Sequence, residues 1–240
     1  MKITVIVPTY NEIENLSKLV SKLFSIPLEI NLIIVDDHSP DRTGDLADRL
    51  AFENPGRITV IHRSGKLGLR TAYLQGFARA FQLDNHAIVQ MDADLSHDPQ
   101  CLLEMAEKLE QFDLVLGSRY LKGGKVDEQW PFWRKALSAW ANFYSRSILR
   151  IPLRDATTGF RMWRTTALKA MPLDRVCSNG YVFLVEMVYL AYRLGYRIGE
   201  VPIYFSERLF GRSKMNFKIQ VEAAFRIWRL PWHYRDVRPR

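Results

Sequence analysis

The chain has 240 residues, a net charge of +8 and 48% hydrophobic residues, a composition typical of a single globular domain. Its two cysteines, Cys101 and Cys177, lack metal-ligand spacing, which excludes a zinc knuckle or disulfide framework and favours a cytoplasmic protein. The first ten residues predict a strand rather than a signal peptide, and no run of about 18 apolar residues predicts a membrane-spanning helix.

Short β-rich runs and amphipathic helices alternate along the first half of the chain. The predicted strands cover residues 3–7, 31–35, 58–62, 87–91 and 113–117, and the clearest helical stripes cover 13–24 and 69–81. Ser39 followed by Pro40 predicts the start of another helix. Asp98 followed by Pro99 repeats this pattern. The alternation predicts an α/β fold with a mostly parallel sheet and helices on both faces.

The second half of the chain is less regular. It predicts a helix at 131–149, a turn into a strand in the segment DATTGFRMW, a helix near 181–194, a strand near 197–205 and a last helix from about residue 216. We expect Glu186, which lies in an apolar helix, to be structural and to pair with a buried arginine. No linker divides the chain into separate physical domains.

Polar residues follow three of the predicted strands. They are Pro8, Thr9, Tyr10, Asn11 and Glu12 after the first strand, Asp36 and Asp37 after the second, and Asp92, Ala93 and Asp94 after the fourth. Because the carboxyl ends of parallel strands share one edge of a sheet, we expect these residues to converge on one cleft. Asp92 and Asp94 could cap a turn or a helix. The acids at neighbouring strand ends favour instead a site for a hard divalent cation, Mg²⁺ or Mn²⁺.

Three common enzyme classes lack their motifs in this chain. No G-x-G-x-x-G follows the first strand, since Gly65 and Gly68 come after the third, so a dinucleotide-binding fold of that type is excluded. The absence of G-x-x-x-x-G-K-[ST] excludes a P-loop nucleotide hydrolase. The absence of G-x-S-x-G leaves no support for a serine hydrolase.

Whole motifs of the chain resemble the family 2 glycosyltransferases, which have the GT-A (Rossmann-like) fold. The motifs occur in the family's order: VIVPTYNEIENL, IIVDDHSPDRT, KLGLRTAYLQGF, MDADLSHDP, LGSRY, TGFRMWR, GYVFLVEM and VPIYFSERLFGRSKM. The resemblance runs from Ile3 to about Met215, and its last motif, with RLFGRSK, points to the dolichyl- or polyprenyl-phosphate mannose synthase branch. It departs from the family at Arg70, where glycine is frequent, and the role of Ser96 varies among members.

The resemblance implies a reaction and a division of the chain. The reaction is the inverting transfer of a hexose, mannose from GDP-mannose, to the phosphate of a polyprenyl or dolichyl phosphate. The alternative is the same fold with UDP-glucose or another nucleotide sugar, or with a hydroxyl acceptor. A GT-A domain at 1–215 would comprise a nucleotide-sugar half at 1–120 and an acceptor half at 121–215, followed by a basic amphipathic tail at 216–240.

The resemblance also implies the residues of the site. The nucleotide sugar is expected to meet Pro8, Tyr10, Glu12, Val35, Asp37, Asp92, Ala93, Asp94, Arg208 and Lys214. Asp92 and Asp94 would hold Mg²⁺ or Mn²⁺, and Arg119 and Arg134 would bind the acceptor phosphate. Asp94 and these two arginines are the expected catalytic residues. A phosphate acceptor arrives as an anion, so it needs cations that position it rather than a general base.

The basic charge is concentrated at the end of the chain. The 48 residues from Arg193 hold 11 Lys and Arg against 4 Asp and Glu, whereas the 192 before them hold 23 and 22. Aromatic and basic residues at helical spacing suit an interfacial helix on anionic lipid, and packing on the domain is the alternative. We expect peripheral attachment to the cytoplasmic face of a membrane, through this tail or a membrane partner. A nucleic-acid-binding module is disfavoured because the body is neutral and has no such motif, and the intact motifs disfavour a silent subunit.

Overall fold

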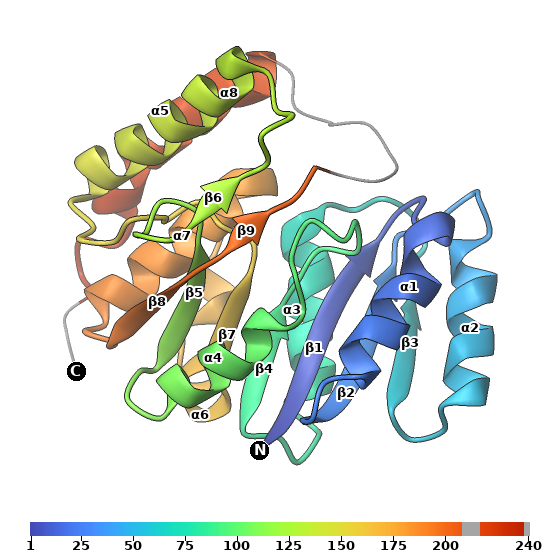
Figure 1. Ribbon diagram of the computed structural model, residues 1–240. Coiled ribbons are helices and arrows are strands. Elements are labelled where there is room, and N and C mark those ends of the chain that lie inside the picture. The colour runs from blue at the N-terminus through green and yellow to red at the C-terminus, as the bar shows by residue number, and fades with distance from the viewer. Residues whose placement is uncertain (208–216, 238–240) are drawn as a thin grey trace.

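The computed structural model describes residues 1–207 and 217–237 as a seven-stranded sheet flanked by helices (Figure 1). The strand order is β3-β2-β1-β4-β7-β5-β8; β7 is antiparallel to both neighbours, and the other pairs are parallel. The strands are β1 (Lys2–Thr9), β2 (Glu29–Asp36), β3 (Ile58–His62), β4 (Ala87–Gln90), β5 (Leu114–Ser118), β7 (Arg161–Arg164) and β8 (Ile198–Pro202). Two short strands, β6 (Lys125–Val126) and β9 (Tyr204–Phe205), pair separately. The predicted mostly parallel sheet is confirmed.

Helices cover both faces of the sheet, also as predicted. One face packs against α1 (Ile13–Phe24), α2 (Thr43–Glu53) and α4 (Cys101–Leu109), and the other against α3 (Leu69–Ala80), α6 (Thr165–Lys169) and α7 (Gly180–Arg193). The helices α5 (Phe132–Leu149) and α8 (Phe217–His233) lie side by side, and α8 also packs on α7 (Figure 1). A 3₁₀ turn, η1 (Leu173–Arg175), precedes α7. Within the two described ranges, no helix has both the length and the apolar character that crossing a membrane requires.

The central strands form because their apolar side chains are buried on both faces. Ile6 and Val7 of β1 are fully buried and face opposite sides of the sheet. On α3, a Cβ atom at Gly76 would lie 2.5 Å from Cγ2 of Ile6, so glycine allows this helix to pack closely on β1. The approach brings Tyr73 of α3 to the end of β4, where its hydroxyl donates a hydrogen bond to the Met91 carbonyl at 3.5 Å.

The start of α2 differs from the prediction. The helix begins at Thr43, so the predicted start at Ser39 and Pro40 is wrong. The Ser39 hydroxyl donates to the Asp36 carboxylate at 2.6 Å and accepts from the backbone N–H of Asn11 at 3.1 Å. The residue that resembled a helix cap therefore joins the ends of β2 and β1.

Two other predicted boundaries shift. The helix α4 begins at Cys101 because the preceding residues form a turn, in which the Asp98 carboxylate accepts from the Gln100 N–H at 3.1 Å. The strand predicted at 197–205 is divided into β8 and β9. The remaining predicted elements are found with ends that differ by a few residues.

The carboxyl-terminal end of α8 is docked on the domain. Ile227 and Leu230 of α8 are buried, as are Tyr234 and Val237 just after the helix ends. Arg175 forms two hydrogen bonds of 2.8 Å with the Asp236 carboxylate, one from each Nη atom. Packing on the domain, one of the two alternatives for the tail, therefore holds for residues 227–237.

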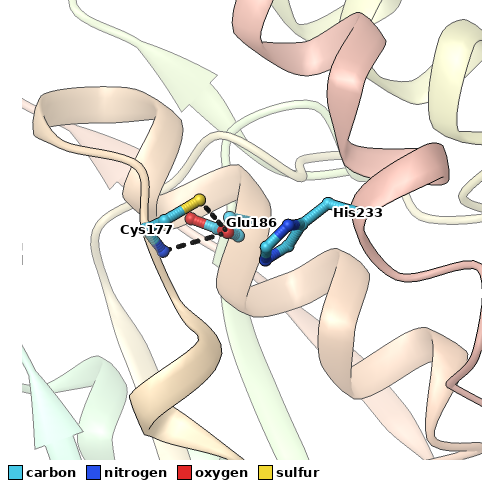
Figure 2. A group of neighbouring side chains, drawn as sticks. All are labelled: Cys177, Glu186 and His233. Atoms are coloured by element: carbon cyan, nitrogen blue, oxygen red, sulfur yellow. Dashed lines mark hydrogen bonds between the residues drawn. The ribbon is translucent and has the colours of Figure 1, made fainter.

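Glu186 anchors this docking, but not through an arginine. Its fully buried carboxylate accepts hydrogen bonds from the Tyr234 hydroxyl at 2.8 Å and from the backbone N–H groups of Cys177 and Ser178 at 3.2 and 2.7 Å. No ion pair with an arginine occurs in the part of the chain that the structure describes, so that prediction is wrong; hydrogen bonds compensate the burial instead. Figure 2 shows Glu186 between Cys177 and His233, whose potential metal-ligand atoms lie within 4.8 Å of one another.

Candidate active site at the carboxyl edge of the sheet

The loops after β1, β2 and β4 each contain a residue with a left-handed backbone. The φ angle is 61° at Asn11, 57° at His38 and 61° at Leu95. Asparagine and histidine tolerate this conformation, whereas a bulky leucine is strained by it. Strained backbone is concentrated at ligand sites, and these three loops lie at one edge because their strands are parallel neighbours. The same edge carries the predicted acids.

Buried hydrogen bonds and an ion pair organise the ends of β1 and β2. The Thr9 hydroxyl donates to the Asp36 carboxylate at 2.9 Å. Asp37, the next residue, forms an ion pair with the buried guanidinium of Arg63, which also donates to the Gly68 carbonyl at 3.3 Å. Burial raises the pKa of Asp37 even though Arg63 opposes the shift. Val35, another predicted contact, is a fully buried core residue beside this site.

The two predicted side chains after β1 have local partners. The ammonium of Lys66 lies 4.2 Å from the centroid of the Tyr10 ring, a cation–π contact. The Glu12 carboxylate accepts from the Asn15 side-chain amide at 2.8 Å, and the Glu12 backbone N–H donates to the Thr43 hydroxyl at 2.9 Å. The contacts of Glu12 join the starts of α1 and α2. Lys66, the cation beside Tyr10, was not predicted from the sequence.

The loop after β4, residues 91–97, holds the two predicted metal ligands. The Asp94 carboxylate is buried and accepts from the backbone N–H of Ser96 at 3.1 Å and from its hydroxyl at 2.5 Å. Asp92 is half-buried and lies over Gly159, where a Cβ atom would come within 3.6 Å of its Oδ2. An oriented Asp94 carboxylate and the Asp92 carboxylate over a glycine offer the oxygen ligands that a hard divalent cation prefers. In this chain Ser96 therefore orients the Asp94 carboxylate through two hydrogen bonds.

Arg119 is held in a buried ion pair. Its Nε lies 2.7 Å from Oδ2 of Asp155, and its Nη2 donates to Oδ1 of Asp155 at 2.9 Å and to the Thr157 hydroxyl at 2.7 Å. Burial alone would raise the pKa of Asp155, but the charge and hydrogen bonds of Arg119 lower it below its ordinary value. The guanidinium is thereby fixed in one orientation.

Arg134, at the start of α5, has a more open environment. Its Nη1 donates to both carboxylate oxygens of Glu207, at 2.9 and 2.7 Å, and its guanidinium lies 3.8 Å from the centroid of a Trp130 ring. The backbone N–H of Glu207 in turn donates to the Asp127 carboxylate at 2.8 Å. Arg134 is therefore stacked and paired, with about a quarter of its side chain exposed (24%).

Phe205 of β9 joins the metal-ligand loop to both arginines. It forms an antiparallel bridge with His97, and the two ring centroids are 5.2 Å apart. The guanidinium of Arg119 lies 5.5 Å from the Phe205 ring centroid, and the Trp130 ring under Arg134 lies 5.6 Å from it. Ring contacts thus connect the loop of Asp92 and Asp94 to Arg119 through Phe205, and to Arg134 through Phe205 and Trp130.

Most predicted site residues occupy this one edge, and two lie outside the described residues. Arg208 and Lys214 fall in 208–216, which begins immediately after Glu207. Arg70 is used for packing, since it donates to the Val176 carbonyl at 2.9 Å and the Asn179 side chain at 3.1 Å. It therefore connects α3 to the start of α7.

Sequence reasoning missed the partners that orient the predicted residues. They are Arg63, Lys66, Asp155, Thr157 and Glu207. The clearest pattern available was Asp155 and Thr157 in RDATTGF, next to a motif that was recognised. The pairings join residues up to 73 positions apart, so spacing along the chain does not reveal them.

Comparison with known proteins identifies the family. The sequence profile described as Glycosyl transferase family 2 matches residues 4–171, more than half of the chain. The chain belongs to this family. Both the predicted family and the GT-A-like α/β fold are confirmed.

Two curated relatives of this family 2 glycosyltransferase are similar over nearly all of its length. The undecaprenyl-phosphate mannosyltransferase of Micrococcus luteus is 42% identical over 242 residues, which cover 100% of this chain and 99% of the relative. The polyprenol monophosphomannose synthase of Mycolicibacterium smegmatis is 42% identical over 224 residues, which cover 93% of this chain and 84% of the relative. The chain therefore lies within the mannosyltransferase branch that the late motif indicated.

Solved structures of lower identity share the fold. Glucosyl-3-phosphoglycerate synthase from Mycobacterium tuberculosis, in complex with Mn²⁺, UDP and glucosyl-3-phosphoglycerate, superposes with a TM-score of 0.65 at 16% identity. The match covers 97% of this glycosyltransferase and 79% of that chain. A second structure of the same protein, with Mn²⁺, UDP-glucose and glycerol 3-phosphate, gives a TM-score of 0.64 at 17% identity.

Proposed function

We propose that this family 2 glycosyltransferase transfers mannose from GDP-mannose to the phosphate of a polyprenyl phosphate, with inversion at the anomeric carbon. The observation that carries the proposal is the arrangement around Phe205, which adjoins the loop of Asp92 and Asp94, the guanidinium of Arg119, and the Trp130 ring that stacks on Arg134. Acids suited to a metal-bound diphosphate thus lie beside cations suited to a phosphate acceptor. The names of the two relatives at 42% identity agree with mannose as the transferred sugar and a polyprenyl phosphate as the acceptor.

The donor would lie along the ends of β2, β1 and β4. Asp92 and Asp94 would hold Mg²⁺ or Mn²⁺, an ion that, when bound, neutralises charge on the departing diphosphate. Mn²⁺ appears in solved structures with this fold, which supports a divalent ion without deciding between the two. Pro8, Tyr10, Glu12 and Asp37 would contact the nucleotide, with Arg208 and Lys214 contributed by residues outside the described ranges.

The acceptor phosphate would bind to Arg119 and Arg134. Asp155 and Thr157 occupy Nε and Nη2 of Arg119, and the described residues offer no hydrogen-bond acceptor to Nη1, which leaves that donor for an anion. A phosphate monoester is already a nucleophilic anion near neutral pH, so these cations orient it without removing a proton. We propose that 1–120 supplies most donor contacts and 121–215 most acceptor contacts, followed by the basic tail 216–240; Arg119, at the end of the first half, and Arg208 and Lys214, near the end of the second, are the exceptions.

The acceptor is a lipid, and the outer surfaces of α5 and α8 suit a lipid bilayer. Their exposed aromatic residues, here called the aromatic surface, are Phe132, Trp133, Trp140, Phe143, Phe225, Trp228 and Trp232. The two helices lie side by side, and the Tyr144 hydroxyl of α5 donates to the Ala224 carbonyl of α8 at 3.2 Å. Exposed Arg150 and Arg229 add positive charge that anionic lipid attracts. Peripheral contact with the cytoplasmic face of a membrane would follow.

A panel of substrates tests the proposed reaction. Purified protein would receive Mg²⁺ or Mn²⁺ with GDP-mannose or UDP-glucose, and a polyprenyl phosphate or the matching free polyprenol. We expect a mannosyl lipid from GDP-mannose and the phosphate alone. Product from UDP-glucose alone would support the alternative donor. UDP-glucose is bound in a solved structure of this fold. Product from the free alcohol alone would overturn the assignment of a phosphate acceptor.

A further inference from the structure

Arg161 is a buried cation that forms no ion pair with a carboxylate of the described residues, although the charge of Asp155 opposes the lowering of its pKa by burial. It is the first residue of β7, and its side chain is fully buried. Its Nε donates to the Thr158 carbonyl at 2.8 Å and its Nη2 to the Ala156 carbonyl at 3.5 Å, whereas Nη1 is buried without a hydrogen-bond partner. Over residues 1–207 and 217–237, no carboxylate forms an ion pair with it.

A charge in this position is costly, and the local hydrogen bonds do not require one. Burying an ion without a counter-ion destabilises a fold, and a neutral amide such as glutamine could donate to the same carbonyl oxygens. Burial lowers the pKa of Arg161 to about 9, so the side chain remains protonated at neutral pH. What arginine adds over a neutral donor is its positive charge.

The position of Arg161 places this charge at the end of the sheet that carries the candidate metal site. Arg161 is opposite Gln90 in the sheet register, and Asp92 follows Gln90 by two residues, or about 7 Å along the strand direction. Arg161 also holds the segment that leads to Gly159, over which the Asp92 carboxylate lies. The site therefore lies at the same end of the sheet as this fixed cation, one strand away.

We infer that Arg161 is a positioning residue for the reaction, whose buried positive charge stabilises the donor diphosphate above Asp92 and Asp94. The inference rests on the proposed function, in which those carboxylates and a divalent ion hold that diphosphate. A fixed cation attracts the diphosphate and repels a free metal ion. Loss of the charge therefore weakens binding of a nucleoside diphosphate with metal, and leaves binding of the metal alone unchanged or tighter.

Two substitutions separate charge from hydrogen bonding. Arg161→Gln keeps a hydrogen-bond donor and loses the charge, whereas Arg161→Lys keeps the charge and loses the guanidinium shape. Titration calorimetry with GDP in saturating Mn²⁺, and electron paramagnetic resonance of Mn²⁺ alone, give the two affinities. We expect Arg161→Gln to bind GDP about tenfold more weakly or worse, and Arg161→Lys to stay within about threefold of wild type. Mn²⁺ alone should bind the glutamine variant at least as tightly as wild type.

Other results would overturn the inference. Unchanged GDP affinity in Arg161→Gln would do so, as would equal losses in both variants, which would indicate that shape rather than charge matters. Should the glutamine variant not fold, Arg161→Met removes the charge with an apolar side chain and takes the place of Arg161→Gln in the comparison with wild type and Arg161→Lys. If wild type itself fails to bind GDP with Mn²⁺, the proposed function fails instead.

Arg164 provides a control on the same strand, with a partly exposed side chain that also pairs with Asp113. It also donates to backbone carbonyls, those of Glu110 and Phe112 at 3.2 and 3.1 Å, but at the opposite end of β7. Arg164→Gln should lower the melting temperature and leave the affinities for GDP and Mn²⁺ unchanged. If it weakened GDP binding as much as Arg161→Gln, the effect would be one of general stability and the inference would fail.

Discussion

Arg119 and Asp155 form a bidentate ion pair inside the domain, with Nε–Oδ2 and Nη2–Oδ1 distances of 2.7 and 2.9 Å. Asp155 is fully buried, and the Arg119 side chain is 10% exposed. The pair fixes the direction of a guanidinium whose charge is proposed to meet the acceptor phosphate. It links stability to function, because any change at Asp155 alters both the fold and the orientation of the cation.

Asp155→Asn should strongly destabilise the protein. The substitution leaves the Arg119 guanidinium buried without its counter-ion, at a cost of about 3–5 kcal/mol in the free energy of unfolding. Urea unfolding followed by circular dichroism measures the change. Asp45→Asn is the control, since Asp45 pairs with Arg42 at an exposed site and should change stability by less than about 1 kcal/mol. Equal effects of the two substitutions would contradict the assigned role of the buried pair.

The same pair predicts a difference in acid sensitivity. The pKa of Asp155 in the folded protein lies below its ordinary value of 3.8, so its contribution is complete above that value and is lost as the pH falls through the lowered pKa. Wild-type melting temperature should therefore fall as the pH is lowered below 3.8, and Asp155→Asn should show a shallower decline. Parallel declines in both proteins would show that Asp155 does not contribute.

The sequence predicted the sheet and the strand-end acids because both depend on local patterns. Apolar runs such as that of β1 reveal strands, and Asp92 and Asp94 directly follow one. The partners of the arginines could not be predicted, because Asp155 and Glu207 meet Arg119 and Arg134 through tertiary packing. Ser39 was mistaken for a helix cap because its actual partner, Asn11, lies in the loop after β1 and is brought to it by tertiary packing.

Substitution of Arg134 should weaken binding of the acceptor and leave binding of the donor unchanged. Arg134→Ala removes a charge-assisted contact worth about 1.5–3 kcal/mol, so we expect the KM for polyprenyl phosphate to rise roughly 10- to 100-fold with the KM for GDP-mannose unchanged. Steady-state kinetics with each substrate varied in turn measure this. Lys135→Ala is the control, because the Lys135 ammonium donates to the Glu128 carbonyl and is not part of the proposed site. A rise in the donor KM alone would contradict the assignment.

The aromatic surface of α5 and α8 should bind lipid. Replacing Phe143 and Trp232 together with serine removes two exposed aromatic side chains, each worth about 1.5–3 kcal/mol when fully buried, so vesicle affinity should fall at least about tenfold. Co-sedimentation with anionic phospholipid vesicles gives the bound fraction. Phe52→Ser is the matched control, since Phe52 is 87% exposed on α2. If the double variant and Phe52→Ser both bind vesicles as tightly as wild type, the aromatic surface is not the lipid contact.

The dependence of product formation on a divalent ion tests the central claim most directly. Purified protein would be given GDP-mannose and polyprenyl phosphate with Mn²⁺, with chelator, and with metal restored, alongside Asp92→Asn and Asp94→Asn. The account predicts that mannosyl lipid forms only when metal is present and forms again when metal is restored. In each variant the rate should fall by about 100-fold or more. Undiminished turnover in chelator and in both variants would contradict it.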